Sequence, residues 1–270
     1  MLVVGLINEK RKIWKKGSGR NLFKSLENDF KAHRIKIGRD KFFKILRRHN
    51  LLITRKSRRA ITTMSYHHYR KYPNLIKEVT PMKANGIWVS DITYIWLEEE
   101  ECFAYLFLIT DMYSRKIVGY CITKSLSRHG AIVSYEMAKK GLTKEALKGC
   151  IHHSDRGVQY CSYDYTDMLK ADGVLLSMTE NGDPRENAIA ERINKTIKEE
   201  FTEKKTLTFN NFTEAKKKMK KIVKFYNEVR PHSSIERYTP NEAYQMEGRL
   251  KRCWKNYYKT RIADGEIIEA

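Results

Sequence analysis

Three apolar segments follow one another between residues 86 and 123, and their order most constrains the fold. They read "GIWVSDITYIWL", "CFAYLFLITDMY" and "RKIVGYCIT" (86–97, 102–113 and 115–123), and they are rich in β-branched and aromatic residues. Because short polar turns join them, we predict three antiparallel strands. Helix and strand then alternate, with a helix over 126–141, a strand over 146–153, a helix over 163–173, a strand over 174–179 and a helix from 183. This alternation implies parallel crossovers, so the sequence predicts a mixed five-stranded α/β sheet.

The positive charge of the chain is concentrated at its N-terminal end. The chain has 270 residues and a formal net charge of +21. Residues 1–80 hold 22 Lys and Arg against 5 Asp and Glu, whereas the remaining 190 residues hold 31 against 27. A basic module joined to a near-neutral one is typical of a polyanion-binding arm on a separate folded unit. The surplus exceeds what a soluble surface requires, so we expect DNA or another nucleic acid as the partner.

Membrane binding is the other function class that a basic arm can indicate. No stretch approaches the ~20 apolar residues of a spanning helix. The initial "MLVVGLI" is too short for the core of a signal peptide, and charged residues follow it. The five cysteines form no CxxC pair, which argues against a zinc cluster or a disulfide framework. We therefore expect a cytoplasmic protein that does not contact a membrane.

Two helices joined by the connector "RIKIG" are predicted in the basic region. Residues 19–33 place four apolar residues on one helical face, namely Leu22, Phe23, Leu26 and Phe30. The second helix, over 39–50, has Asp40 as a plausible N-cap and Asn50 as a plausible residue just after the C-cap. It buries Phe42, Phe43 and Leu46 and leaves four basic residues outward, namely Lys41, Lys44, Arg47 and Arg48. The pair favours a helix-turn-helix, with an ordinary helical pair and a solvated basic face as the alternative.

Three acidic residues occupy positions that the predicted sheet brings together. Asp91 lies inside an apolar strand, where an unpaired carboxylate is costly. Asp155, in "HHSDRGVQY", follows the fourth strand, which should run beside the first. Glu191 lies on the helix after the fifth strand, outside its buried stripe of Ile189, Ile193 and Ile197. Three acids at one end of a mixed sheet predict a two-metal site, and their hard oxygen ligands suit Mg²⁺ or Mn²⁺.

Each of these acids also has a structural interpretation. Asp155 stands in Ser-Asp-x-Gly, which is ordinary turn composition, and Glu191 could form a surface pair with Lys195. Glu186 is assigned to a capping box with Asp183 as the N-cap and Pro184 at the first helical position. The Glu191 face also carries amides and lysines that we expect beside a phosphate backbone, namely Asn187, Asn194, Lys195 and Lys198.

Smaller signals remain open to two interpretations. His152 and His153 could bind metal, but the acids already supply hard ligands, so we expect His153 to orient the loop. Asp111 ends the second strand and is expected to cap a turn. A helix over 211–229 should bury one apolar face, while its "AKKKMKK" run is a basic or merely solvated face. The segment 249–261 fits DNA contact and core packing of Trp254 equally well.

The predicted element order matches a ribonuclease-H-like fold, and the acids stand in motifs that resemble a known family. Asp91 in "WVSDITYI", Asp155 in "HHSDRGVQY" and Glu191 in "ENAIAERINKTIKEE" resemble the DDE triad of retroviral-integrase-like transposases. Three further stretches, "DMYSRKIVGY", "YNEVRPHSSIERYTPNEAY" and "GSGRNLFKSL", are similar to the larger frame (orfB) of insertion sequences in the IS-three family. The resemblance extends from about residue 17 to about residue 245.

This resemblance implies the catalytic subunit of a DNA transposase, in a bacterium and associated with the nucleoid. Asp91, Asp155 and Glu191 would be its catalytic and metal-binding residues, with Mg²⁺ or Mn²⁺ as the cofactor. It implies cleavage of transposon ends and transfer of a 3′-hydroxyl into target DNA by a homo-oligomer. The product of a smaller upstream frame (orfA), separate or fused, would supply the first end-binding module. A non-catalytic DNA-binding protein or repressor derived from a transposase is the alternative.

We divide the chain on these grounds into four parts. Residues 1–54 form a basic helical DNA-binding arm, residues 55–85 a basic linker and residues 86–230 the integrase-like catalytic core. Residues 231–270 form a C-terminal extension.

Overall fold

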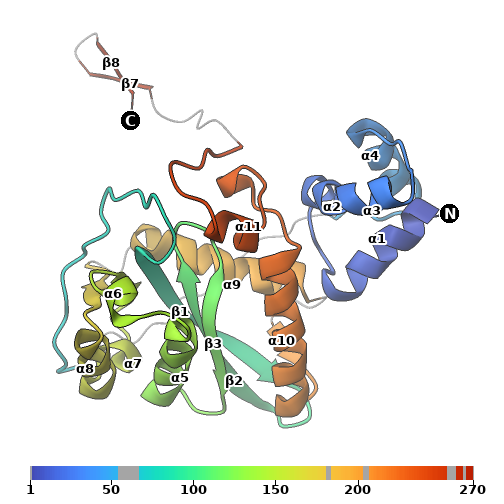
Figure 1. Cartoon of the computed structure of the whole chain (residues 1–270). Helices are drawn as coiled ribbons and strands as arrows, with labels where there is room; N and C mark the ends of the chain where they lie inside the picture. Colours follow the sequence, from blue (N-terminus) through green and yellow to red (C-terminus); the bar gives the residue numbers. More distant parts are fainter. Residues whose placement is uncertain are drawn as a thin grey trace.

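The computed structural model describes residues 2–53, 67–180, 184–202, 207–253, 260–263 and 266–269. A mixed sheet with helices on both faces forms the main body, and a smaller helical arm stands beside it (Figure 1). The strand order is β3-β2-β1-β4-β5, and β6 also pairs with β1. The strands of this sheet are β1 (Ile87–Leu97), β2 (Cys102–Asp111), β3 (Ile117–Thr123), β4 (Ile151–Ser154), β5 (Leu175–Met178) and β6 (Leu207–Phe209).

The central strand β1 joins the antiparallel and parallel parts of the sheet. β2 pairs antiparallel with β1 and β3, whereas β4 pairs parallel with β1 and β5. This confirms the predicted order of strands, which is that of a ribonuclease-H-like fold. The predicted number of strands was five, and the structure has a sixth because β6 pairs with the far end of β1 at Ile95 to Leu97. A three-residue strand is too short to show an alternating pattern in the sequence.

One face of the sheet is covered by short helices that pack very closely. A Cβ atom at Gly130 would lie 2.3 Å from the ring of Phe107, and one at Gly119 would lie 2.0 Å from the carbonyl oxygen of Ser134. Helix α5 can therefore approach the sheet only because both positions are glycine. The helices on this face are α5 (Arg128–Lys139), α7 (Val158–Cys161) and α8 (Tyr163–Ala171).

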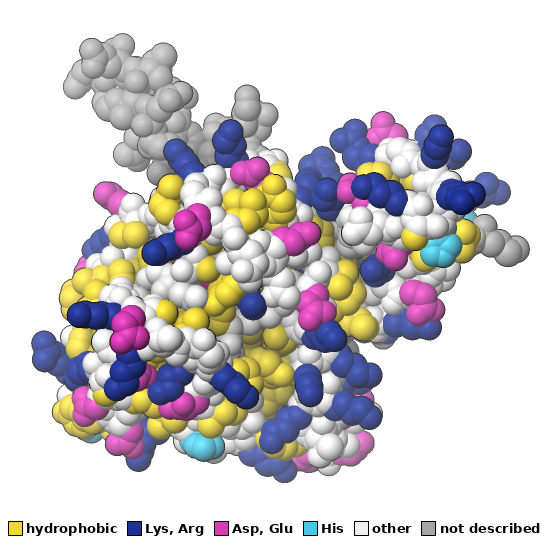
Figure 2. Space-filling model, viewed as in Figure 1, with side chains coloured by type: hydrophobic (Ala, Val, Ile, Leu, Met, Phe, Trp, Pro, Cys, Tyr) yellow, Lys and Arg dark blue, Asp and Glu magenta, His cyan; other side chains and the backbone are white. Residues whose placement is uncertain are grey.

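The opposite face is covered by two longer helices, α9 (Ala188–Glu200) and α10 (Phe212–Glu228). Ile193 and Ile197 of α9 are buried as predicted, and Ile189 is half-buried. Helix α10 buries most of its predicted apolar face, namely Met219, Ile222, Val223 and Tyr226, while Phe212 is half-buried. The lysines of the "AKKKMKK" run are exposed. They contribute to the dark blue region at the lower right of Figure 2.

The arm contains one helix that the sequence analysis missed and one that is interrupted. Its helices are α1 (Leu2–Ile13), α2 (Gly19–Ser25), α3 (Glu27–Ala32) and α4 (Arg39–Arg48). The predicted single helix over 19–33 breaks at Leu26, whose N–H lies 3.2 Å from the carbonyls of both Leu22 and Phe23. The break lets Phe23 and Phe30 pack around Phe42, with ring centroids 5.3 and 6.0 Å away.

The ends of α4 differ in how well they were predicted. The helix begins after Gly38 as its N-cap, so the prediction of Asp40 as the N-cap was wrong, and Asp40 lies in the first turn. The C-terminal end is as predicted, because Asn50 has a left-handed φ of 55°. The N–H of Leu51 donates to the carbonyl of Leu46 at 2.8 Å, which completes a common helix-terminating motif.

Two further element boundaries differ from the predictions. Residues 144–147 form a short helix, α6 (Lys144–Leu147), so the strand predicted over 146–153 begins only at Ile151. A 3₁₀ helix (Pro184–Asn187) precedes α9, and Asn187 is the N-cap of α9. Asp183 lies outside the described residues. Glu186 accepts a hydrogen bond from the N–H of Glu180 at 2.6 Å, so it has a structural contact that differs from the predicted capping box.

The described part of the expected linker lies along the edge of the sheet. The N–H of Leu75 donates to Ser177 Oγ at 2.8 Å, and the N–H of Met178 donates to the carbonyl of Pro73 at 3.3 Å. Residues from 67 onward therefore extend the core at β5. Beyond α10 lie α11 (Pro240–Tyr244) and a two-stranded sheet of β7 (Thr260–Ala263) and β8 (Glu266–Glu269). Trp254 is outside the described residues, and within those residues no helix is long and apolar enough to cross a membrane.

Candidate active site

Asp91 and Asp155 lie side by side where the parallel strands β1 and β4 end their pairing. Val89 pairs with His153 in the register of these strands. Two more residues along each chain bring Asp91 next to Asp155, which begins the loop after β4. Asp155 Oδ1 also accepts the N–H of Gly157 at 3.0 Å. Asp155 therefore caps its turn, and it lies close enough for its charge to act on Asp91.

The carboxylate of Asp91 is held by two hydrogen bonds in a site that disfavours its charge. Its Oδ1 accepts the N–H of Ile92 at 2.8 Å, and its Oδ2 accepts the amide Nδ2–H of Asn194 at 2.7 Å. Burial raises the pKa of Asp91 to about 7, and the negative charges of Asp155 and Glu191 add to this, while the two hydrogen bonds oppose it. A carboxylate with so perturbed a pKa beside like charges is typical of a functional site.

Glu191 lies on the first turn of α9, near enough to Asp91 for its charge to act on that carboxylate. Its side chain is exposed, and its charge contributes to the raised pKa of Asp91. Within the part of the chain that the structure describes, no three His, Cys, Asp or Glu side chains converge closely enough to hold a metal ion. The fold thus gathers the three acids without bringing them into a closed set of ligands.

Two amides of α9 lie against β1, on the inner side of the helix. Asn194 was expected to face DNA, but it is buried and donates to Asp91. Asn187 is also buried, and its Nδ2–H donates to the carbonyl of Ser90 at 2.9 Å. Because they stand four residues before and three residues after Glu191, they fix the rotation of α9 about its axis at the acid site.

The two lysines of α9 differ in exposure and in the charges near them. Lys195 is exposed, and its Nζ lies 3.6 Å from Glu199 Oε1. Lys198 is half-buried. Burial lowers the pKa of Lys198, and the charge of Asp91 opposes that shift, so Lys198 lies within electrostatic reach of the acids.

The two histidines before Asp155 pack beneath the acids. His152 Nε2 lies 2.7 Å from Ser90 Oγ and 2.9 Å from the hydroxyl of Tyr165, and His153 Nδ1 lies 2.8 Å from Ser177 Oγ. Burial lowers the pKa of His152 to about 3 and that of His153 to about 4, so both are neutral. Their contacts tie β4 to its neighbours in the sheet.

Asp111 caps a turn, as predicted. It is buried at the end of β2, where its Oδ1 accepts the N–H and the hydroxyl of Ser114 at 2.8 and 2.6 Å. Its Oδ2 accepts the N–H of Asn85 at 2.8 Å. These contacts hold the β2–β3 turn.

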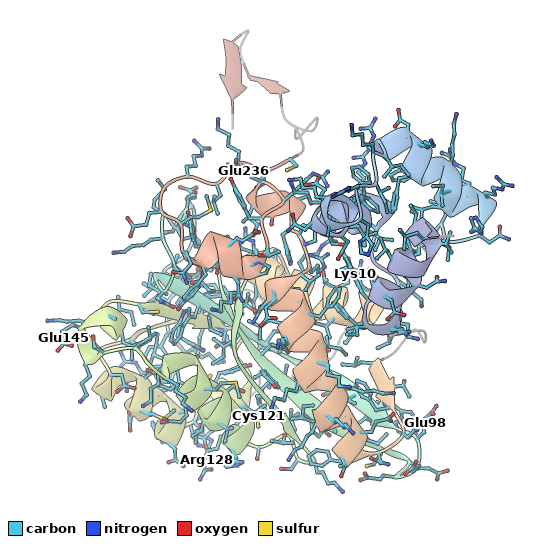
Figure 3. The ribbon with its side chains drawn as sticks, turned by 45° about the vertical axis from the view of Figure 1, so that its right-hand side comes forward. Lys10, Glu98, Cys121, Arg128, Glu145 and Glu236 are labelled. Atoms are coloured by element: carbon cyan, nitrogen blue, oxygen red, sulfur yellow. The ribbon has the colours of Figure 1, made fainter. Side chains whose placement is uncertain are left out.

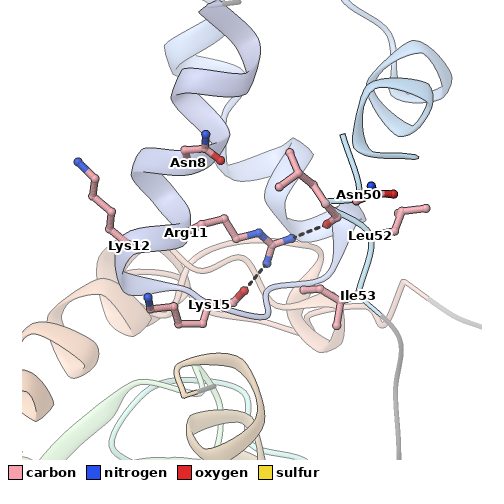
Figure 4. A pocket seen from close by; sticks show the side chains of 8 residues that line it. Asn8, Arg11, Lys12, Lys15, Asn50, Leu52 and Ile53 are labelled. Carbon is pink, nitrogen blue, oxygen red and sulfur yellow. Dashed lines mark hydrogen bonds between the residues drawn. The ribbon is translucent and has the colours of Figure 1, made fainter. Parts of the chain in front are cut away.

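The arm presents its basic residues to solvent. Lysine and arginine side chains surround it at the upper right of Figure 2, and the outward residues of α4 are all exposed, namely Lys41, Lys44, Arg47 and Arg48. A cavity of about 410 Å³ lies between α1 and residues 50–53 (Figure 4). Arg11 lines it and donates to the carbonyls of Lys15 and Leu51 at 3.1 and 3.4 Å, so this arginine closes the end of α1.

Known proteins resemble this chain over most of its length. Two models described as "Integrase core domain" match residues 81–184 and 172–240. A 31 kDa protein of insertion element IS600 from Shigella sonnei is 32% identical over 217 residues, which are 80% of this chain and 78% of that protein. The transposase for insertion sequence element IS904 from Lactococcus lactis subsp. lactis is 32% identical over 186 residues, 66% of this chain and 71% of the transposase.

Among solved structures, a chain in the cryoEM structure of the simian T-cell lymphotropic virus intasome in complex with PP2A regulatory subunit B56 gamma shows a TM-score of 0.49 at 15% identity. The match covers 74% of this chain and 67% of that chain. At 32% identity, this chain covers more than two thirds of the length of both the IS600 protein and the IS904 transposase. The chain therefore belongs to the insertion-sequence transposases of the DDE integrase superfamily, which act in DNA transposition.

Proposed function

We propose that this chain is the catalytic subunit that cleaves transposon ends and transfers their 3′-hydroxyl groups into target DNA. The observation that carries the proposal is that Asp91 and Asp155 lie together where the pairing of β1 and β4 ends. The charge of Glu191, on α9, also contributes to the raised pKa of Asp91. In this proposal Asp91, Asp155 and Glu191 would hold the divalent metal ions.

The residues fit one or two divalent cations of the Mg²⁺ or Mn²⁺ type by the chemistry of their donors. Three carboxylates that repel one another supply the hard, negative oxygens that such ions prefer. Asn194 Oδ1 is a further oxygen next to Asp91, buried and without a hydrogen-bond partner among the described residues. When bound, such ions stabilise the attacking and leaving oxygens of a phosphoryl transfer.

The chain's own residues would orient the acids and the DNA. Asn194 holds the carboxylate of Asp91 in one orientation. Lys198 would supply positive charge near that carboxylate, and the exposed Lys195, four residues after Glu191, would contact a phosphate group. On the arm, Lys41, Lys44, Arg47 and Arg48 would contact the DNA backbone. We propose further that the chain acts as a homo-oligomer on DNA, with an upstream-frame product supplying the first end-binding module.

Substitution of the acids tests the proposal. Asp91→Asn, Asp155→Asn and Glu191→Gln each remove a ligand's charge with little change in volume, so each should abolish metal-dependent nicking of supercoiled plasmid and leave DNA affinity nearly unchanged. Glu186→Gln is the matched control. Its carboxylate bonds a backbone N–H, so it should cost about 1 kcal/mol of stability and retain nicking.

The outcomes separate the alternatives. Full activity in one acid variant would remove that residue from the site. Loss of nicking in Glu186→Gln with retention in Glu191→Gln would identify Glu186 as the third acid. If the wild-type chain binds DNA but does not nick it with Mg²⁺ or Mn²⁺, the chain is a non-catalytic DNA-binding protein.

A further inference from the structure

The C-terminal end of α9 is joined to two distant segments through the side chain of Glu200. Its Oε2 accepts the indole N–H of Trp14 at 2.6 Å and the Nε–H of Arg230 at 2.7 Å, and its Oε1 accepts an Nη2–H of Arg230 at 2.7 Å. The backbone carbonyl of Glu200 accepts the N–H of Lys16 at 2.6 Å. We call Trp14, Glu200 and Arg230 the Glu200 junction, because they join the arm, the helix that carries Glu191 and the loop after α10.

The Glu200 junction is closed to solvent. Trp14 is fully buried, and the side chains of Arg230 and Glu200 are only 8% and 15% exposed. The Trp14 ring stacks on Phe201 with a centroid distance of 6.5 Å. On another side it is packed so closely that a Cβ atom at Gly17 would lie 2.3 Å from it. Figure 3 shows α1, which carries the labelled Lys10, beside the upper end of α10.

The acid at this position does not serve the helix itself. Glu200 is the last residue of α9, where the helix dipole disfavours a negative charge. Its charge is instead matched by Arg230, whose Nη1–H donates to His232 Nε2 at 2.8 Å. Burial and the charge of Arg230 hold the pKa of His232 well below its ordinary value, so His232 is a neutral acceptor. The contacts with Arg230 and Trp14 therefore explain why a carboxylate stands at the end of α9.

The Glu200 junction fixes one end of the helix whose other end carries the acid site. Asn187 and Asn194 hold the N-terminal half of α9 to β1. Glu200 lies nine residues after Glu191, a separation of about 14 Å at the rise of an α-helix. Since a helix of this length moves as a rigid element, a shift at Glu200 also moves Glu191. Trp14 belongs to the basic arm, so the docking of the arm and the placement of α9 depend on the same contact.

We propose that Glu200, held by Arg230 and Trp14, is a positioning residue for Glu191, and that the Glu200 junction couples the docking of the arm to the geometry of the acid site. This inference rests on the proposed function, in which Glu191 is a catalytic acid. A junction with only a structural role would stabilise the fold without affecting the positions of Asp91, Asp155 and Glu191 relative to one another.

The test compares Trp14→Phe, Glu200→Gln and the matched control Glu199→Gln in the full chain. Glu199 is an exposed neighbour on the same helix that pairs with Lys195. Three quantities are measured, namely amide hydrogen exchange over residues 187–194, Mn²⁺ affinity of the DNA-free chain by electron paramagnetic resonance, and plasmid nicking at increasing Mn²⁺. The first two variants should exchange faster over 187–194 and bind Mn²⁺ roughly tenfold more weakly, as for other losses of support behind a metal ligand, while the control matches the wild type.

The readouts keep this inference separate from the proposed function. Wild-type exchange over 187–194 and wild-type Mn²⁺ affinity in both Trp14→Phe and Glu200→Gln would show a purely structural junction and overturn the inference. Trp14→Phe retains a buried ring without the N–H donor, so the test stands even if Glu200→Gln does not fold. If exchange and Mn²⁺ affinity respond as expected while the wild-type chain does not nick DNA, the positioning role is supported and the proposed catalysis fails.

Discussion

Arg230 and Glu200 should be strongly coupled in the stability of the fold. In Arg230→Met the methionine fills the space of the arginine stem but carries no charge. The carboxylate of Glu200, whose side chain is 15% exposed, then keeps only the Trp14 N–H among the side-chain donors described above. Removing one partner of a buried ion pair typically costs about 3–5 kcal/mol, because the other charge stays buried. We expect a loss in this range.

The reverse and double substitutions complete the cycle. Glu200→Gln keeps an acceptor for the Trp14 N–H but leaves the guanidinium of Arg230, 8% exposed, with His232 as a neutral partner. We expect a cost of about 3 kcal/mol. In the double variant neither charge remains, and the loss is limited to hydrogen bonds, about 1–2 kcal/mol. The double variant should therefore be more stable than either single variant.

The free energy of unfolding is measured by urea titration, followed by circular dichroism, for the wild type and the three variants. The coupling energy between the two sites should be at least about 3 kcal/mol. If the cost of the double variant equals the sum of the single costs, the two side chains do not form the buried pair, and the reasoning is refuted.

Three further predictions concern the packing at two glycines, a half-buried carboxylate and the arm. Gly119→Ala places a Cβ atom 2.0 Å from a carbonyl of α5 and should cost about 1–3 kcal/mol in the urea titration. Gly5→Ala, with nothing within 4 Å, should gain roughly 0.5–1 kcal/mol, and an equal loss in both would contradict the packing argument. Burial opposes ionisation of Asp172, but hydrogen bonds from Lys139 and Tyr135 outweigh it and lower its pKa. Ionised Asp172 therefore adds to the free energy of unfolding above its ordinary pKa, and this stabilisation is lost as the pH falls through the lowered pKa. The difference in stability between the wild type and Asp172→Asn should shrink in acid. A constant difference in urea titrations across this pH range would exclude the linkage. Alanine should replace three exposed basic residues of α4 together, namely Lys44, Arg47 and Arg48. The slope of log DNA affinity against log salt concentration, measured by fluorescence anisotropy, should become shallower by about 0.9 per lost phosphate contact. An unchanged slope would show that α4 faces away from DNA.

Much of the fold could be predicted because its signals are local. Each long strand has its own run of β-branched and aromatic residues, and the short turns dictate antiparallel pairing. The helix α1 was missed because Ile7 is its one buried residue among those the structure describes, and a single buried position makes no repeating apolar pattern. The break at Leu26 was missed because the apolar spacing continues across it, and the interruption arises from packing around Phe42.

The gathering of the acids was also predictable, because the ends of adjacent parallel strands meet at one edge of the sheet. The orientation of Asn194 could not be predicted, because the Glu191 face of α9 borders both β1 and solvent. A small rotation of the helix about its axis decides whether an amide on this face is buried against β1 or exposed. The Glu200 junction left one sequence signal, an acid in the last helical turn against the helix dipole. Its partners, Trp14 and Arg230, could not be inferred, because no local pattern links positions 186 and 30 residues away.

The separation of Trp14 from Glu200 has a consequence for the synthesis of the protein. The two residues are 186 positions apart, so the arm leaves the ribosome well before the helix on which it docks. At about 5–20 residues per second, the intervening chain takes roughly 10–40 s to make. During that interval Trp14 has no docking surface, while the basic residues of α4 are already present. The arm therefore exists for this interval without the segment that carries Glu191, and under the proposed function its contact with DNA would precede completion of the acid site.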